Sequence, residues 1–369
     1  MDESAKCGFL SGDRLPTISA SPGLTDDPED ANPPSKAAVR KQDRLWWIFL
    51  SITAGVFFLS VVAFILSFSP SSSVPSRLCK NPTVRREWRT LDRSEKLAYI
   101  EAARCLTESP STRRSETTIH DDFVFLHSRI GNYSHNAAPF LPWHRYFIHL
   151  YEQALHKHCN YSGVLPYWNW SLDWEDLSKS PVWDNETGFG GSGSGAESVA
   201  NGRCVLDGPF AGAQAAYYEG NYHPHCLSRG FLADEVIRRV GRLTVQPAIL
   251  NRVFEEQDYY DFLLKVEQAS HLTIPYIVQG DFSKVTAPND PVFFLHHGQV
   301  DRVWWIWQQR HHRDGNPLGG YDGISRNNST VSAHITDMLD FDGFASDVSV
   351  DDVMDTQTGI LCYQYDELL

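Results

Sequence analysis

The stretch DDFVFLHSRIGNYSHNAAPFLPWHRYF (121–147) places three histidines, His127, His135 and His144, among aromatic and aliphatic residues. Apolar residues before His127 recur at helical spacing, and Pro142 is tolerated in the first turn of a following helix. The pattern therefore predicts His127 on one helix, His135 in the next loop and His144 early in a second helix. Three imidazoles can converge in this way, and imidazole is the commonest metal ligand in proteins.

A second stretch, EQASHLTIPYIVQGDFSKVTAPNDPVFFLHHGQVDRVWW (267–305), carries the other candidate ligands. His271 ends one predicted helix. His296 and His297 follow Asp290-Pro291, which is a helix-start signal made of an N-cap residue and a proline at the first helical position. Adjacent residues on a helix point about 100° apart, so we expect only one of this pair to face a metal easily.

The remaining periodicity predicts a mainly α protein with long loops. Apolar positions at helical spacing indicate helices at 83–106, 120–130, 142–158, 258–270 and 291–310. The glycine- and serine-rich stretch 188–202 predicts a flexible loop inside the domain, because strong patterns continue on both sides of it. The residues after 309 are rich in aspartate and short of apolar periodicity.

Together the two histidine stretches resemble the copper motifs of the tyrosinase family, also called type 3 copper proteins. The phrases LPYWNW (165–170) and DGPF (207–210) are similar to the short fungal branch of that family. The resemblance extends from about Cys79 to about Gln309. It implies a four-helix bundle around a binuclear copper site, in which two copper ions and dioxygen oxidise phenols or catechols to quinones.

The resemblance also implies roles for individual residues. Three histidines match the ligands of the first copper ion and two match ligands of the second: His127, His135 and His144, then His271 and His297. His296 resembles a residue that supports another ligand from behind. Glu152 and Asp301 lie on metal-bearing helices and are candidates for orienting the ring nitrogens.

The sequence departs from the family at the second copper site. The usual motif is His-x-x-x-His, but here it reads His271-Leu-Thr-Ile-Pro275, and proline has no ligand atom. Proline also argues against a helix that continues through residue 275. Three explanations compete: two histidines plus water, a substitute such as His223 or His225, or a weak or empty second site. In the last case the protein is a mononuclear copper or dioxygen binder without phenol oxidase activity.

Two further positions bear on the reaction. Leu272 stands where members that hydroxylate monophenols often carry asparagine, which helps a water molecule to deprotonate the phenol. Glu267 resembles the acidic residue that would hold this water, and it is the predicted catalytic residue. The absence of asparagine favours catechol oxidation over tyrosine hydroxylation. The expected substrate is a phenolic small molecule or a tyrosine-containing peptide, and the expected setting is secondary-metabolite biosynthesis.

Outside the copper motifs, the N-terminal part of the chain has a different composition. Residues 1–45 are proline-rich and lack apolar periodicity, which predicts a disordered tail. Residues 46–68, WWIFLSITAGVFFLSVVAFILSF, carry no charge, and at about 1.5 Å per residue they span roughly 34 Å. We predict a transmembrane helix there, a linker at 69–76 and a copper domain at 77–369.

Charge, glycosylation sequons and cysteines predict the orientation in the membrane. Basic residues before the span favour a cytosolic tail. Six Asn-x-Ser/Thr sequons lie beyond it, and we expect the one at Asn169 to stay unmodified because it falls in an aromatic run that should be buried. Together with the six cysteines, the other five favour a lumenal or extracellular domain of a single-pass secretory-pathway protein, a glycoprotein with disulfide bonds. Six cysteines allow 15 pairings, and the sequence does not choose among them. The net charge of −14 argues against a nucleic-acid partner.

Overall fold

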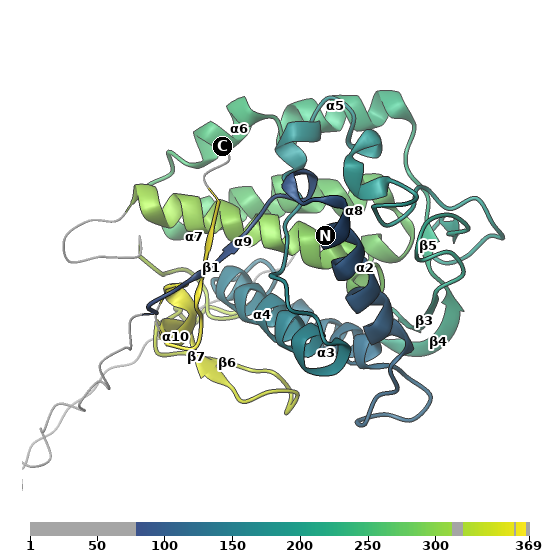
Figure 1. Ribbon diagram of the computed structural model, residues 1–369. Coiled ribbons are helices and arrows are strands. Elements are labelled where there is room, and N and C mark those ends of the chain that lie inside the picture. The colour runs from purple at the N-terminus through teal and green to yellow at the C-terminus, as the bar shows by residue number, and fades with distance from the viewer. Residues whose placement is uncertain (1–78, 312–319, 358, 367–369) are drawn as a thin grey trace, which may run out of the picture. The chain divides into compact units, whose positions relative to one another are not determined.

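Four helical segments carry the two histidine stretches into contact (Figure 1). They are α3 (Ile119–Ser134), α4 (Phe140–Cys159), α9 (Val292–Arg310) and a composite helix. The composite helix consists of α7 (Tyr259–Lys265), one turn of π-helix (Val266–His271) and α8 (Leu272–Val278). In Figure 1, α3 and α4 lie below α7, α8 and α9. The predicted mainly α class and helical bundle are confirmed.

This computed structural model describes residues 79–311, 320–357 and 359–366. Within these ranges no helix combines the length and apolar character needed to cross a bilayer. The predicted tail, membrane helix and linker, residues 1–76, lie outside the described part of the chain. They remain predictions from the sequence.

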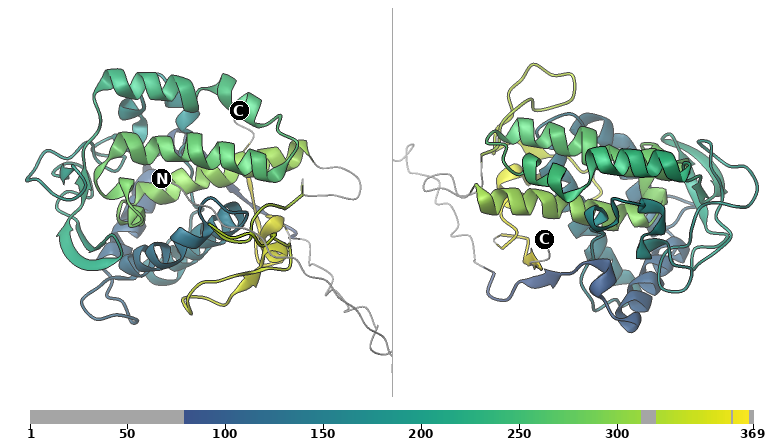
Figure 2. Two further views of the ribbon diagram at one scale, coloured as in Figure 1. Left: turned by 180° about the vertical axis from the view of Figure 1, so that it is seen from behind. Right: turned by 90° about the horizontal axis from the view of Figure 1, so that it is seen from above.

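Shorter elements surround the bundle. Figures 1 and 2 show α5 (Asp234–Thr244) and α6 (Pro247–Val253) on the side of α8 that faces away from α3 and α4. The other α-helices of the described residues are α2 (Arg93–Glu108) and α10 (Val350–Met354). Four two-stranded sheets pair β1 (Thr83–Arg85) with β8 (Tyr363–Tyr365), β2 (Arg203–Cys204) with β5 (Ser228–Arg229), β3 (Gln214–Tyr218) with β4 (Asn221–Cys226), and β6 (Met338–Leu339) with β7 (Val348–Ser349). Only the β1–β8 pair is parallel among these.

The first predicted helix, 83–106, begins later than the sequence pattern indicated. Residues 83–85 form strand β1, and α2 begins at Arg93. Asp92 explains the start, because its carboxylate accepts a hydrogen bond from the backbone N–H of Glu95 while the Glu95 side chain accepts from the Asp92 N–H. This reciprocal capping box ends the extended segment and starts the helix.

The prediction that no helix continues through Pro275 is wrong. Pro275 lies inside α8, as its fourth residue. The π-helical turn Val266–His271 comes directly before α8, so the missing proline N–H removes one hydrogen bond at the start of a helix rather than in the middle of a long one.

The stretch 188–202 is packed rather than a free loop. The buried Arg229 guanidinium donates hydrogen bonds to the carbonyl oxygens of Phe189, Gly190 and Gly191 and forms an ion pair with Asp290, with 2.6 Å between Nε and Oδ2. At Gly193 a Cβ atom would lie 1.9 Å from the Arg203 carbonyl oxygen. The glycines therefore allow close backbone approach, which composition alone does not distinguish from flexibility.

The C-terminal segment also packs on the bundle, although its sequence showed little apolar periodicity. Phe341 stacks on Trp143 of α4, with ring centroids 5.3 Å apart and planes at 8°. The Trp143 indole N–H donates to the Asp340 carbonyl oxygen at 2.9 Å. Single buried residues between turns make these contacts. The sequence of this segment therefore shows no helical or strand periodicity from which its packing could be predicted.

Three disulfide bonds resolve the pairing that the sequence left open. They join Cys79 to Cys362, Cys105 to Cys159 and Cys204 to Cys226. The first connects the two ends of the described chain, and the second connects α2 to the end of α4. Disulfide bonds persist mainly in oxidising compartments, and the compartment of this protein stays a prediction from the sequence.

A buried polar network joins β1 and β8 to the bundle. Asp301 of α9 receives hydrogen bonds from Arg145 Nε at 2.5 Å, Tyr363 OH at 2.6 Å and Tyr365 OH at 2.5 Å. Arg85 of β1 donates to Glu152 at 2.7 Å and also contacts Asp301 at 3.4 Å. Burial and the neighbouring Asp301 raise the pKa of both tyrosines, so both hydroxyls stay protonated and can donate. Glu152 and Asp301 thus hold arginines and tyrosines, not the histidine rings.

Candidate metal centre

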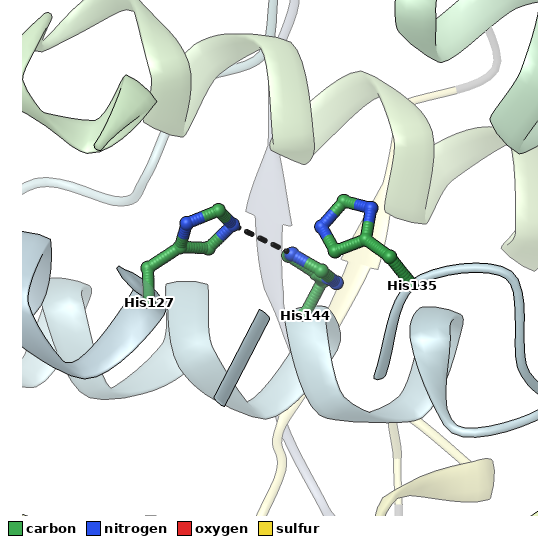
Figure 3. A group of neighbouring side chains, drawn as sticks. All are labelled: His127, His135 and His144. Carbon is green, nitrogen blue, oxygen red and sulfur yellow. Dashed lines mark hydrogen bonds between the residues drawn. The ribbon is translucent and has the colours of Figure 1, made fainter. Parts of the chain in front are cut away.

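The first histidine group lies where α3 and α4 meet (Figure 3). His127 is on α3, His135 caps the C-terminus of α3, and His144 is in the second turn of α4. One ring nitrogen from each histidine lies within 4.8 Å of the others. The three imidazoles predicted to converge from two helices and the connecting loop are therefore brought together.

The outward nitrogen of each ring is held by a hydrogen bond. His127 Nδ1 lies 2.6 Å from the Val285 carbonyl oxygen, and His144 Nδ1 lies 2.8 Å from that of Phe140. His135 Nδ1 lies 2.9 Å from a Glu267 carboxylate oxygen. Carbonyl and carboxylate oxygens only accept, so each Nδ1 carries a proton and each Nε2 is left with a lone pair.

The lone pairs converge on one another. The Nε2 atoms of His127 and His144 lie 3.3 Å apart, drawn as the dashed line in Figure 3. With both protons on Nδ1, neither Nε2 can donate to the other. Burial, followed by the neighbouring His135, lowers the pKa of His127 to about 3, and the same causes lower the pKa of His144. The rings of His127 and His144 are therefore neutral at physiological pH, and a cation between their Nε2 atoms would remove the repulsion of the two lone pairs.

The second group consists of His271, His296 and His297, and its ring nitrogens also lie within 4.8 Å of one another. His271 ends the π-helical turn, and the other two are on α9. All three are buried, and burial is the main cause that lowers their pKa values, to about 3 for His296. Both nitrogens of His296 and of His297 and Nδ1 of His271 have no hydrogen-bond partner within the described residues.

His296, which the resemblance places behind another ligand, has a ring nitrogen within 4.8 Å of those of His271 and His297. Its ring is 5.1 Å from that of His271 and 5.1 Å from that of His297, between ring centroids. Two adjacent residues of α9 both reach the group because His271 approaches from a separate helix. We expected only one of His296 and His297 to face the site, because adjacent residues of one helix point in different directions. That argument did not include the position of His271 on the neighbouring helix.

The two groups adjoin. The rings of His144 and His297 stack, with centroids 4.4 Å apart and planes at 13°, and the rings of His135 and His271 lie 5.6 Å apart. A cavity of about 200 Å³ opens beside them. Histidines from both groups line it, together with Leu272, Pro275, Phe282, Lys284 and Phe293.

Glu267 lies beside the first group and is almost fully buried. Its carboxylate accepts from His135 Nδ1 and from the backbone N–H of Asn136, which is 2.9 Å from each oxygen. Glu267 is not among the residues that line the cavity. The geometry shows it orienting the His135 ring; its predicted role as the residue that holds a catalytic water remains a prediction.

The proposed substitutes for Pro275 lie elsewhere. His225 Nε2 is 2.9 Å from Asp281, and His223 is exposed on β4. Neither belongs to a histidine group. Val285 and Phe140 orient the rings of His127 and His144 through their backbone carbonyls. No sequence pattern indicates this role, because every residue has a carbonyl whatever its side chain.

The donor set suits copper. Six imidazoles, three in each group, suit a metal that cycles between two oxidation states, and within the described residues no carboxylate belongs to either group to favour Mg²⁺ or Ca²⁺. A helical bundle with two adjoining groups of three histidines defines a paired-copper protein of the type 3 class.

Comparison with known proteins agrees. Residues 117–310 match the common central domain of tyrosinase. The chain is 40% identical to the tyrosinase-like protein phomQ1 of Diaporthe leptostromiformis, over 91% of this chain and 93% of that protein. It is 31% identical to the N-acetyl-6-hydroxytryptophan oxidase ivoB of Emericella nidulans, over 78% and 93%. A polyphenol oxidase variant from Thermothelomyces thermophila has a TM-score of 0.68 at 26% identity, over 78% and 89%. This chain belongs to the tyrosinase family, and it is a copper oxidoreductase.

Proposed function

We propose that the protein oxidises a catechol or phenol to a quinone or hydroxylated product with dioxygen, using two copper ions. The observation that carries this proposal is the pair of adjoining groups of three imidazoles beside one cavity. His127, His135 and His144 would hold one ion, and the group that contains His271 and His297 would hold the other. When bound, the copper ions supply dioxygen binding and redox chemistry. Phe140 and Phe293 pack against the histidine rings and make the surroundings of both groups apolar.

The cavity suggests the part of the substrate that enters. Its volume, about 200 Å³, is below the roughly 300–1,000 Å³ of pockets for drug-sized ligands. A single aromatic ring therefore fits between Leu272, Pro275 and Phe293, while the rest of the molecule stays outside. Both a phenolic small molecule and a tyrosine side chain of a peptide meet this requirement, and a role in secondary metabolism is part of the proposal.

The cavity also favours catechols over monophenols. Leu272 offers no polar atom at the position where asparagine would help to activate water, and it is 46% exposed at the cavity. The Glu267 carboxylate is already used by His135 and Asn136. Few groups remain to remove the proton of a monophenol, whose pKa resembles that of tyrosine, about 10.

The test is copper content and oxygen uptake of the purified full-length protein after anaerobic Cu(I) loading and dialysis. We expect about two copper ions per chain, as the two histidine groups predict. We also expect oxygen uptake with 4-methylcatechol that exceeds uptake with 4-methylphenol. One copper per chain, or no uptake with either compound, would rule out the proposed function.

Lys284 predicts a preference for anionic substrates. It is the charged residue among those that line the cavity, and its Nζ lies 2.7 Å from Glu219 in the structure. The carboxylate of a substrate could replace Glu219 as its partner. N-acetyl-6-hydroxytryptophan, named in the relative ivoB, has an acylated amine and so keeps only its carboxylate charge.

We expect Lys284→Met to raise the KM for 3-(3,4-dihydroxyphenyl)propanoate by about 1.5- to 5-fold, the range that an exposed ion pair of about 0.2–1 kcal/mol gives. The KM for its methyl ester should not change. Glu219→Gln, the matched control, removes the competing carboxylate and should lower the KM for the acid. Equal changes in the KM for the acid and for the ester would show that Lys284 does not interact with the charge of the substrate.

We also propose that 46–68 anchors the protein in a secretory-pathway membrane, with 1–45 cytosolic and the copper domain, 77–369, lumenal or extracellular. The uncharged run, the sequons beyond it and the three disulfides support this topology. Protease treatment of intact microsomes tests it, since digestion of the copper domain without detergent would contradict it.

A further inference from the structure

The second histidine group lacks the residue that completes it in the family pattern. Pro275, four residues after His271, lines the same cavity as the histidines but offers no ligand atom. His271 and His297 alone would leave the second ion with one imidazole fewer than the first. The structure places a further ring, that of His296, in the group.

His296 has no other visible task. It is fully buried, and neither ring nitrogen has a hydrogen-bond partner within the described part of the chain. A residue that orients a metal ligand does so through a hydrogen bond, as Glu267 does for His135. The His296 ring instead lies nearly parallel to that of His271, with planes at 27°. Buried unpaired nitrogens are rare in proteins and require a partner.

We propose that His296 is the third ligand of the second copper ion and replaces the ligand lost at Pro275. The π-helical turn Val266–His271 and α9 supply the two sides of this site, so that His271 comes from one and the adjacent pair His296 and His297 from the other. This assignment rests on the proposed function for the identity of the metal. It accounts for a site with three imidazoles without the usual His-x-x-x-His motif.

Copper content of the full-length protein tests the assignment without relying on activity. His296→Asn keeps a polar side chain of similar reach but removes the strong ligand. We expect about two copper ions per chain for the wild type and about one for this variant, after anaerobic Cu(I) loading and dialysis. If His296 only positioned a neighbour by hydrogen bonding, the asparagine variant would keep two.

A second variant tests whether His296→Asn loses copper only because the protein misfolds. Pro275→His combined with His296→Asn restores the family motif, and we expect it to bind about two copper ions again. His158→Ala, an exposed histidine on α4, is the control and should leave copper content unchanged. Two copper ions in the His296→Asn variant, or no recovery in the double variant, would overturn the assignment.

The outcomes also separate this assignment from the proposed function. A wild type with two copper ions but no oxygen uptake with catechols would remove the function and leave the role of His296 open to the same copper measurements. A wild type that binds two copper ions and oxidises catechols, alongside a His296→Asn variant that still binds two, would remove only the assignment. One copper in the wild type would remove both.

Discussion

Replacing His144 with alanine is expected to lower catechol oxidation by on the order of 10³-fold, about 4 kcal/mol of activation free energy. His144 is the imidazole that adjoins both groups: its Nε2 is 3.3 Å from that of His127, and its ring stacks on His297 at 4.4 Å. Its loss removes a ligand from the first copper ion and leaves a gap where its ring packs against His297 of the second group. We expect copper content to fall from about two to about one ion per chain.

The measurement compares oxygen uptake with 4-methylcatechol, copper content and far-ultraviolet circular dichroism for the wild type and His144→Ala. His158→Ala is again the matched control, because it removes an imidazole from the same helix without touching either group. A His144→Ala protein that keeps two copper ions and more than a tenth of the activity would show that the group does not bind copper as proposed.

Replacing Asp301 with alanine is expected to lower the free energy of unfolding by about 3–5 kcal/mol, the cost of leaving buried charges without a partner. Asp301 accepts hydrogen bonds from Arg145, Tyr363 and Tyr365, and it contacts Arg85. Without its carboxylate, Arg145 loses its ion pair inside the protein. Strands β1 and β8 also lose their hydrogen bonds to Asp301 of α9, the helix that carries His296 and His297.

Urea unfolding of the metal-free protein, followed by tryptophan fluorescence, measures this loss without a contribution from copper. Glu108→Gln is the control, because it breaks an exposed ion pair with Arg104 on α2 and should cost about 0–1 kcal/mol. A loss below about 1 kcal/mol for Asp301→Ala would mean that the disulfides and the surrounding aromatic packing hold the terminal strands without the network.

Much of the fold and site could be predicted because local patterns carry them. Helical spacing of apolar residues located the bundle helices, and the spacing of His127, His135 and His144 correctly predicted that their rings converge. The caps were less visible, since the start of α2 depended on Asp92 and Glu95 rather than on the apolar period. The prediction that no helix continues through Pro275 was wrong, because a π-helical turn precedes α8 and places the proline in the first turn of that helix.

The remaining features depend on contacts between distant segments. His296 joins the second group only because His271 approaches α9 from another helix, and Val285 orients His127 through a carbonyl that every residue possesses. The Asp301 network connects β1 and β8 to α9, and its Arg85 and Tyr365 are 280 positions apart.

Helical class, family resemblance and the identity of most candidate ligands follow from the order of the amino acids, because helical periodicity and residue chemistry are local properties. Three features required the folded chain: the disulfide pairing, the packing of 188–202, and the presence of His296 beside His271 and His297. Those three features depend on which distant segments pack against one another. Many different local sequence patterns are compatible with the same packing, so the local pattern does not predict it.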